Sequence, residues 1–192
     1  MCRTVVVMRR TVVTLSAALL IGCSGGSTSG DGAAPGDAAF NDADVEFVQG
    51  MIPHHEDAIR MADMVKRDAV SVGTADLADQ IRSAQELEIV VMRELLGEWG
   101  LEEDPHAMHK MDDHSMSGMM TNDDYAALDA ATGIDFERMW LTMMVEHHEG
   151  AVTMSEKVIA EGKDFRVREL AESIIAVQRD EIARMKALLN GL

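Results

Sequence analysis

Four stretches of the chain place apolar residues at alternating spacings of four and three, the pattern of helices that bury one stripe. Runs that alternate apolar and polar residues, as half-buried strands do, are few. Polar or glycine-containing segments at 71–74, 97–100 and 162–164 separate the stretches, and Gly191 ends the last one. We therefore expect an all-α protein, an up-down four-helix bundle in which short turns make consecutive helices antiparallel neighbours.

The sequence repeats itself at a constant offset. Residues 47–61 align with residues 140–154, and residues 81–96 align with residues 174–189, each shifted by 93 positions without a gap. A repeated unit that contains two helical stretches and a short connection is a helical hairpin. The bundle should therefore consist of two repeated hairpins, which could pack about a pseudo-twofold axis.

The repeat sets the expected organisation of the chain after its first 40 residues. We predict a first repeat at residues 41–99 and a second repeat at residues 135–192, within one domain at 41–192. The linker between them, residues 100–134, is long enough to hold a short helix near residues 123–131.

Caps and a proline mark the two helices that begin the repeats. Asp42 or Asp44 is expected to cap the first, and Asp135 the helix that begins the second repeat. Pro53 removes one backbone hydrogen bond, so the first helix should kink there. The second repeat has Glu146 at the equivalent position, so the halves cannot be fully equivalent.

Residues 1–23 are typical of a bacterial lipoprotein signal peptide. Two arginines, Arg9 and Arg10, precede an apolar run at residues 11–21 that is too short to span a bilayer comfortably. The run ends in the sequence LIGC, which resembles the lipobox, so Cys23 would carry a lipid. Residues 24–40, rich in Gly, Ser, Asp and Pro, are typical of a flexible tether. The alternative for the apolar run is a buried helix.

Such processing would place the protein outside the cytoplasm, anchored to the bacterial membrane and facing the periplasm or the exterior. The start codon could be Met1 or Met8. Cys2 would leave with the signal and Cys23 would be lipidated, so no thiol would remain for a disulfide or a metal site.

The chain is strongly acidic, with a formal net charge of −17. A surface of this sign repels nucleic acid and attracts cations, so we expect no nucleic-acid partner. A solvated surface that keeps an exported protein soluble explains most of the charge by itself.

Each predicted inward stripe contains polar residues among apolar ones. His54 and Glu88 are equally distant from the turn near residue 71, so they should lie at one level, as should His147 and Glu181 near residue 164. Buried without partners, these groups would cost several kcal/mol, about 2–7 each. They could form a network that only fixes helix register, or two imidazoles and two carboxylates could bind a divalent ion.

Further candidate ligands lie near this layer. His55 and His148 fall about 100° around the helix, at the edge of the stripe. Four methionines lie on the stripes one or two turns from the histidines, where they either fill the core or add thioether ligands: Met51, Met61, Met144 and Met154.

The linker contains the strongest chemical signal in the sequence. Five methionines and three histidines fall within fifteen residues: His106, Met108, His109, Met111, His114, Met116, Met119 and Met120. The segment is too polar for a buried helix, and thioethers favour Cu(I) while imidazole suits Cu(I) and Cu(II). The pattern predicts a copper site, with zinc or another divalent ion as second candidate. A compositionally biased linker without function is the alternative.

The motifs MIPHHxxAIxMA at 51–62, MMVxHHxGAVxM at 143–154 and QxxEIxxM at 85–92 and 178–185 resemble the domain of unknown function 305 family. The resemblance covers about residues 40–192. It implies a ferritin-like four-helix fold, export to the envelope and, in some members, copper binding and copper tolerance. A di-iron centre would need Glu-x-x-His on two helices, and neither repeat of this sequence contains the motif.

We therefore expect an envelope-anchored copper buffer, scavenger or carrier, with a copper-transfer protein as a candidate partner. Enzymatic turnover has little support, because no nucleophile with its base and no phosphate loop occurs. Two alternatives remain: a structural or interaction module whose polar layer only sets register, and a metalloenzyme that uses the inner layer.

Overall fold

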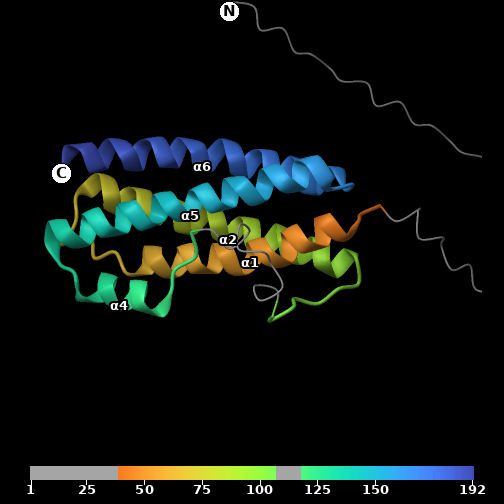
Figure 1. Cartoon of the computed structure of the whole chain (residues 1–192), viewed down its shortest axis with the longest axis horizontal. Coiled ribbons are helices and arrows are strands. Elements are labelled where there is room, and N and C mark those ends of the chain that lie inside the picture. The colour runs from red at the N-terminus through yellow and green to blue at the C-terminus, as the bar shows by residue number, and fades with distance from the viewer. Residues whose placement is uncertain (1–38, 107–117) are drawn as a thin grey trace, which may run out of the picture. The chain divides into compact units, whose positions relative to one another are not determined.

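The computed structural model describes residues 39–106 and 118–192. Within these residues it contains five helices and no strand (Figure 1). The helices are α1 (Asp42–Asp63), α2 (Val72–Glu98), α4 (Asn122–Ala130), α5 (Gly133–Glu161) and α6 (Phe165–Gly191). None of these helices is long and apolar enough to cross a membrane. The all-α prediction is confirmed.

The four long helices form the expected bundle of two hairpins, with α4 beside it (Figure 1). α1 pairs with α2 and α5 with α6, while contacts of α1 with α5 and of α2 with α6 join the hairpins. The indole Nε1 of Trp140, early in α5, donates to the carbonyl of Met61, late in α1, at 2.9 Å. α1 and α5 therefore run antiparallel, as an approximate twofold axis between the repeats requires.

The core consists of two hydrophobic clusters, and residues that are equivalent in the two repeats belong to opposite clusters. Phe47 and Met51 belong to the first cluster, while their equivalents 93 residues later, Trp140 and Met144, belong to the second. Along α1, the first cluster takes residues up to Ile52 and the second begins at Ala58. The histidine doublet at 54–55 falls between the two clusters, so a polar layer divides the core.

A buried carboxylate ties the start of α1 to the turn between α5 and α6. The N-cap of α1 is Asn41, not Asp42 or Asp44; Asp44 instead completes a capping box with it. Oδ2 of Asp44, a fully buried residue, also accepts from the backbone N–H of Lys163 at 2.9 Å and of Asp164 at 3.0 Å. Asp44 thus satisfies backbone donors of a turn 120 residues away.

The second repeat has the equivalent contact. Glu137, 93 residues after Asp44, accepts from the backbone N–H of Ser71 at 3.0 Å and from the hydroxyl of Thr74. Ser71 is itself equivalent to Asp164, and the two residues cap α2 and α6. Each repeat therefore supplies one carboxylate that holds the hairpin turn of the other.

One further sequence expectation about helix ends differs from the structure. α5 begins at Gly133 with Thr132 as its N-cap, so Asp135 lies in the first turn, where its charge favours the helix dipole without capping. Pro53 lies inside α1, which continues to Asp63, and the kink expected there stays a prediction. α2 ends as its glycines indicate: Gly100 has a positive φ of 71°, and the amide of Leu101 bonds back to the carbonyl of Leu96.

Replacing Asp44 should destabilise the protein more than replacing its counterpart in another capping box. Asp124 holds the same N3 position at the start of α4, but among the described residues its side chain bonds only to Thr121. We expect Asp44→Ala to lower the free energy of unfolding by about 2–4 kcal/mol, because it also leaves buried turn amides unpaired. Asp124→Ala should cost about 1 kcal/mol. Equal losses in chemical denaturation would show that the contact to the α5–α6 turn adds nothing.

Candidate functional site

Four histidines occupy the layer between the two hydrophobic clusters, and each is fully buried. The rings of His54 and His147 face one another where α1 meets α5, with centroids 3.9 Å apart and planes inclined by 42°. These two residues are repeat equivalents, so the approximate twofold axis passes between them. This contact agrees with the expectation that both side chains lie on the inward stripes at one level.

The partners of the two glutamates differ from the sequence-based expectation, which pairs Glu88 with His54 and Glu181 with His147. Oε2 of Glu88 instead lies 2.7 Å from Nε2 of His55, and Oε2 of Glu181 lies 3.0 Å from Nε2 of His148. Counting residues from the turn predicts at which level along the bundle each side chain lies. It does not predict how each helix is rotated about its own axis. α2 packs against the side of α1 that presents the second histidine, and α5 packs against the side that presents the first.

His55 and His148 are therefore not edge residues. Both have no exposed side-chain area, because α1 and α5 are each covered on two sides rather than along one stripe. The paired carboxylates are nearly buried as well, at 17% exposed side-chain area for Glu88 and 8% for Glu181.

Several polar atoms of this layer have no hydrogen-bond partner among the described residues. They are Nδ1 of His55, Nδ1 of His148 and the amide groups of Gln85 and Gln178. Each glutamine lies three residues before the glutamate of its helix and is 2% exposed. Buried polar atoms of this kind are rare in native proteins and point to a further partner. Within residues 39–106 and 118–192, no three or more His, Cys, Asp and Glu side chains form a group arranged for a metal.

The beginning of the Met/His segment rests on α1 beside the histidines. The amide of Gln49 donates to the carbonyl of Glu102 and its oxygen accepts from the backbone N–H of Asp104, both at 2.8 Å. Pro53, one residue before the doublet, lines a cavity with Asp104 and Pro105. Residues 102–105 are therefore fixed next to the start of the histidine layer.

The other end of the segment contacts α5 at the histidine layer itself. Gly118 has a φ of 85°, and a Cβ built there would lie 2.3 Å from the carbonyl oxygen of Glu146 and 2.5 Å from Cα of His147. The backbone N–H of Met120 donates to Oδ2 of Asp57 at 3.0 Å. Only glycine allows the backbone to come this close.

Asp57 is the functional candidate that the sequence analysis missed. Its Oδ1 accepts from the hydroxyl of Tyr125 at 2.6 Å, and its Oδ2 lies 3.6 Å from Nε2 of His147. Burial raises the pKa of Asp57, although bonds from Tyr125 and Met120 oppose that shift. The signal was present in the repeat: Asp57 aligns with Gly150, so only one half has this carboxylate.

Of the eight candidate metal ligands in the linker, three lie among the described residues. His106 is exposed, and Met119 and Met120 are half-buried, with Met120 packed on the second cluster. The remaining five lie outside the described residues: Met108, His109, Met111, His114 and Met116.

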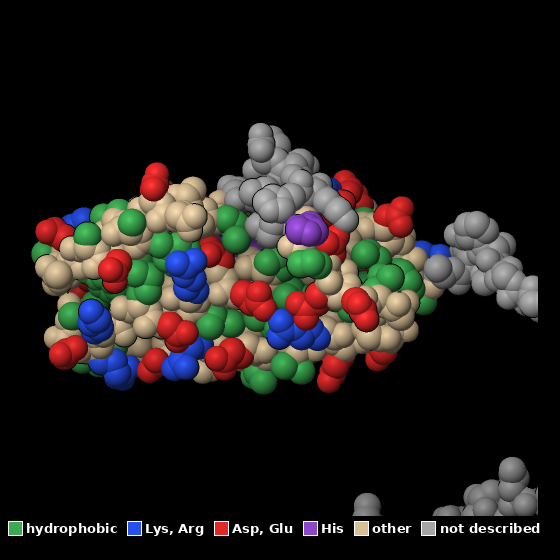
Figure 2. Space-filling view, turned by 90° about the horizontal axis from the view of Figure 1, so that it is seen from below, with side chains coloured by type: hydrophobic (Ala, Val, Ile, Leu, Met, Phe, Trp, Pro, Cys, Tyr) green, Lys and Arg blue, Asp and Glu red, His purple; other side chains and the backbone are tan. Residues whose placement is uncertain are grey.

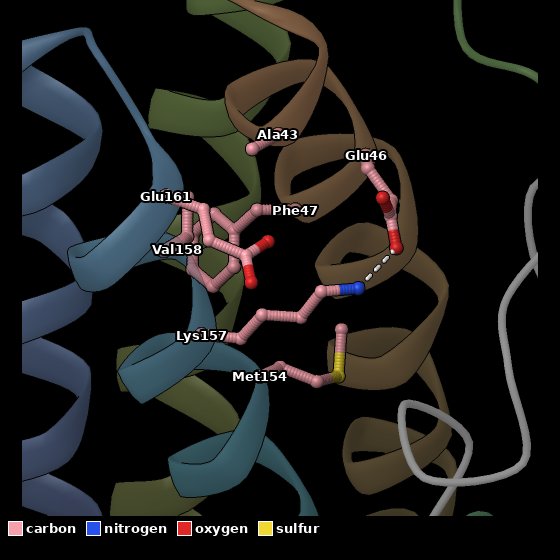
Figure 3. Close-up of a pocket in the computed structure, with 7 residues that line it drawn as sticks. All are labelled: Ala43, Glu46, Phe47, Met154, Lys157, Val158 and Glu161. Atoms are coloured by element: carbon pink, nitrogen blue, oxygen red, sulfur yellow. Dashed lines mark hydrogen bonds and ion pairs between the residues drawn. The ribbon is translucent and has the colours of Figure 1, made fainter.

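The four core methionines are all buried, and Met154 lies away from the histidines. Figure 3 shows it in the wall of a small pocket between α1 and α5, next to Lys157, whose Nζ bonds Glu46 at 2.8 Å. The pocket volume of about 20 Å³ is enough for one water. Met51 and Met144, by contrast, lie one helical turn before His55 and His148.

The protonation of His147 is set by its surroundings. Burial lowers the pKa of His147 well below its ordinary value, and the neighbouring imidazoles of His54, His148 and His55 lower it further. The ring is therefore neutral at physiological pH. Neutral imidazole is the form that binds metals.

A family model for a domain of unknown function, DUF305, matches residues 44–189. The chain is a DUF305 protein. This match confirms the resemblance seen in the histidine and QxxE motifs. The structure of a DUF305 fragment from Deinococcus radiodurans is similar with a TM-score of 0.72 and 28% identity, over 81% of this DUF305 chain and 100% of that one.

Two other solved structures of this kind are informative. CopM in its Cu(II)-bound form is similar with a TM-score of 0.66 and 32% identity, over 77% of this chain and 96% of CopM. CopM is also known in Cu(I)-bound and silver-bound forms. A DUF305 protein from Streptomyces coelicolor, assigned as secreted, has a TM-score of 0.67 and 27% identity, over 78% and 91% of the two chains.

A curated relative shares a shorter segment. The uncharacterized protein L153 of Acanthamoeba polyphaga mimivirus is 37% identical over 54 residues, which are 28% of this DUF305 chain. The match spans 36% of the viral protein's own length.

Substitution of Gly118 should release the end of the Met/His segment from α5. Gly118→Ala must move the backbone away from Glu146, so we expect a loss of about 2–4 kcal/mol in unfolding free energy from strain and lost contacts. Gly100→Ala is the matched control, since Gly100 also has a positive φ but a Cβ added there would meet no atom within 4 Å. It should cost only about 1–2 kcal/mol. The close approach to α5 is refuted if both variants melt alike.

Acidification should destabilise the metal-free protein through His147. Below a pH of about 6.5 the unfolded chain binds a proton at this residue and the folded protein does not, so the free energy of unfolding falls as pH falls. The slope from one such group is at most about 1.4 kcal/mol per pH unit. We expect His147→Asn to reduce this slope in denaturation curves between pH 7.5 and 5. An unaltered slope in His147→Asn contradicts the assignment.

Proposed function

We propose that this DUF305 protein binds copper at the cell envelope and buffers, scavenges or delivers it for copper homeostasis and tolerance. The observation that carries the proposal is the buried layer of four imidazoles in two repeat-equivalent doublets, each one turn after a buried methionine. Imidazole and thioether together suit both oxidation states of copper. CopM, which has a similar fold, is known in Cu(II)-bound and Cu(I)-bound forms.

The proposed donors fall into two groups. The core group comprises the histidine doublets and the buried methionines of the same helices, with Glu88 and Glu181 bonded to two of the rings: His54, His55, His147, His148, Met51, Met61, Met144 and Met154. The linker group extends from His106 to Met120, and its two described ends are fixed to α1 and α5 at the level of the core doublets. This arrangement supports transfer of an ion between surface donors and buried ones.

The location and partners follow from the same proposal. We place the mature chain outside the cytoplasm, tethered through a lipid at Cys23 and residues 24–40, with a copper-transfer protein as its partner. Asp and Glu side chains are spread along the face in Figure 2, interspersed with Lys and Arg, and the net charge of −17 would attract cations to the protein. Zinc remains the second candidate ion, and we propose a binding protein rather than an enzyme.

A second candidate function rests on the same contacts. The 2.7 Å and 3.0 Å His–Glu bonds satisfy one nitrogen of each ring and fix α2 against α1 and α6 against α5. A structural or interaction module would use this layer only to fix the register of the helices. Metal binding separates the two functions.

Copper titration of residues 24–192 tests the proposal. We expect the protein to retain Cu(I) against a moderate chelator, with sulfur and nitrogen ligands in X-ray absorption. Replacing the eight linker Met and His residues with Ser or Ala should remove part of the bound copper, because soft donors bind Cu(I) far better than hydroxyls. The equivalents that remain belong to the core.

The linker control is Asp112→Asn with Asp113→Asn, which changes the charge of the same segment and leaves its soft donors in place. It should bind as much Cu(I) as the unaltered chain. Retention of no copper by the unaltered protein rejects the proposal and favours the structural module.

A further inference from the structure

The hydrogen bonds of the core doublets determine which ring nitrogen carries the proton. Nε2 of His55 lies 2.7 Å from a carboxylate oxygen of Glu88, within a buried contact. An ionised carboxylate only accepts hydrogen bonds, so Nε2 must be the donor. In a neutral imidazole the second nitrogen, Nδ1, then carries a lone pair and no proton.

That lone pair belongs to a fully buried side chain. No hydrogen-bond partner for Nδ1 of His55 occurs among the described residues. The second repeat has the same arrangement, because Nε2 of His148 contacts Glu181 at 3.0 Å and Nδ1 of His148 has no described partner. The repetition at 93 residues makes two equivalent buried acceptors, each in need of a donor or a cation.

We propose that Glu88 and Glu181 are not metal ligands but fix His55 and His148 as Nε2–H tautomers, so that each ring binds a monovalent soft ion, Cu(I) or Ag(I), through Nδ1. This inference rests on the proposed copper function and assigns the ligand atom within it. The carboxylate that receives the other ring N–H is the usual outer partner of a metal-binding histidine.

The direction of the side chains supports this assignment. Side chains of a helix incline toward its N-terminus, over the residue one turn earlier. That residue is Met51 for His55 and Met144 for His148, and both methionines are fully buried. His55 and His148 thus each share a helical face with a thioether, the donor that selects Cu(I). The carboxylates contact Nε2, which leaves Nδ1 as the nitrogen available to an ion.

One arrangement without metal competes with this one. Gln85 and Gln178 are 2% exposed, their amides have no described partner, and each precedes the relevant glutamate by one turn. If an amide N–H donated to Nδ1, the ring would be satisfied entirely by protein. The tautomer would be the same, but Nδ1 would be closed to an ion.

Nitrogen-15 NMR of the histidine rings distinguishes these arrangements, with diamagnetic Ag(I) as the probe. In metal-free residues 24–192 at pH 8, we expect His55 and His148 to show a protonated Nε2 and an unprotonated Nδ1. Addition of Ag(I) should shift the Nδ1 resonance of both residues and leave their Nε2–H correlations in place. Loss of the Nε2–H signal, or a larger shift at Nε2 than at Nδ1, overturns the inference because the ion would then have displaced the carboxylate.

Other outcomes separate this inference from the proposed function. Ag(I) bound with no change at either Nδ1 overturns the inference while metal binding stands, as the glutamine-closed arrangement predicts. No Ag(I) or Cu(I) bound at all overturns both.

Substitution of the carboxylates gives a second readout. Glu88→Gln and Glu181→Gln keep the side-chain shape and remove the charge, and we expect each to weaken Ag(I) binding about 10–100-fold at its own histidine. Glu86→Gln and Glu172→Gln, at exposed positions on the same helices, are the matched controls and should bind like the unaltered chain. An affinity loss that also occurs in the controls reflects overall charge and overturns the positioning role. Full Ag(I) affinity in Glu88→Gln and Glu181→Gln also overturns the positioning role.

Discussion

Four imidazoles buried at one level of a helical bundle are the constraint on which the rest of this structure depends. Each ring must find hydrogen-bond partners or a cation, because an unpaired buried polar group costs about 1–3 kcal/mol. The carboxylates of Glu88 and Glu181 supply one partner to His55 and His148 from the neighbouring helices. Those contacts fix how far α2 slides along α1 and α6 along α5, and they divide the core into two clusters.

Duplication explains both the symmetry of this layer and its exceptions. Two copies of one hairpin that pack about a twofold axis must place equivalent residues opposite each other, as His54 and His147 are. The same symmetry exchanges the turn-holding carboxylates Asp44 and Glu137. The axis is broken at Asp57, which has Gly150 as its equivalent and which holds the end of the Met/His segment on one face only.

The helices of this fold can be predicted from the sequence because the helical period and the repeat offset are both read directly along the chain. It also places the histidines and glutamates at the correct level, since rise per residue is constant. Rotation about the helix axis is different: His54 and His55 differ by about 100°, and which of them meets Glu88 depends on where three other helices pack. Contacts of Asp44 with a turn 120 residues away, or of Gly118 with α5, depend on tertiary geometry that no spacing records.

A structural role and a metal-binding role for the polar layer are therefore compatible in the same residues. A ring whose Nε2–H is held by a buried carboxylate is fixed in register, in rotation and in tautomer, and a ligand fixed in this way loses little entropy when an ion arrives. The same bond that orders α2 against α1 thus orients Nδ1 of His55. In His55 and His148, Nε2 stabilises the metal-free fold through its bond to the carboxylate, and Nδ1 provides the capacity to bind an ion.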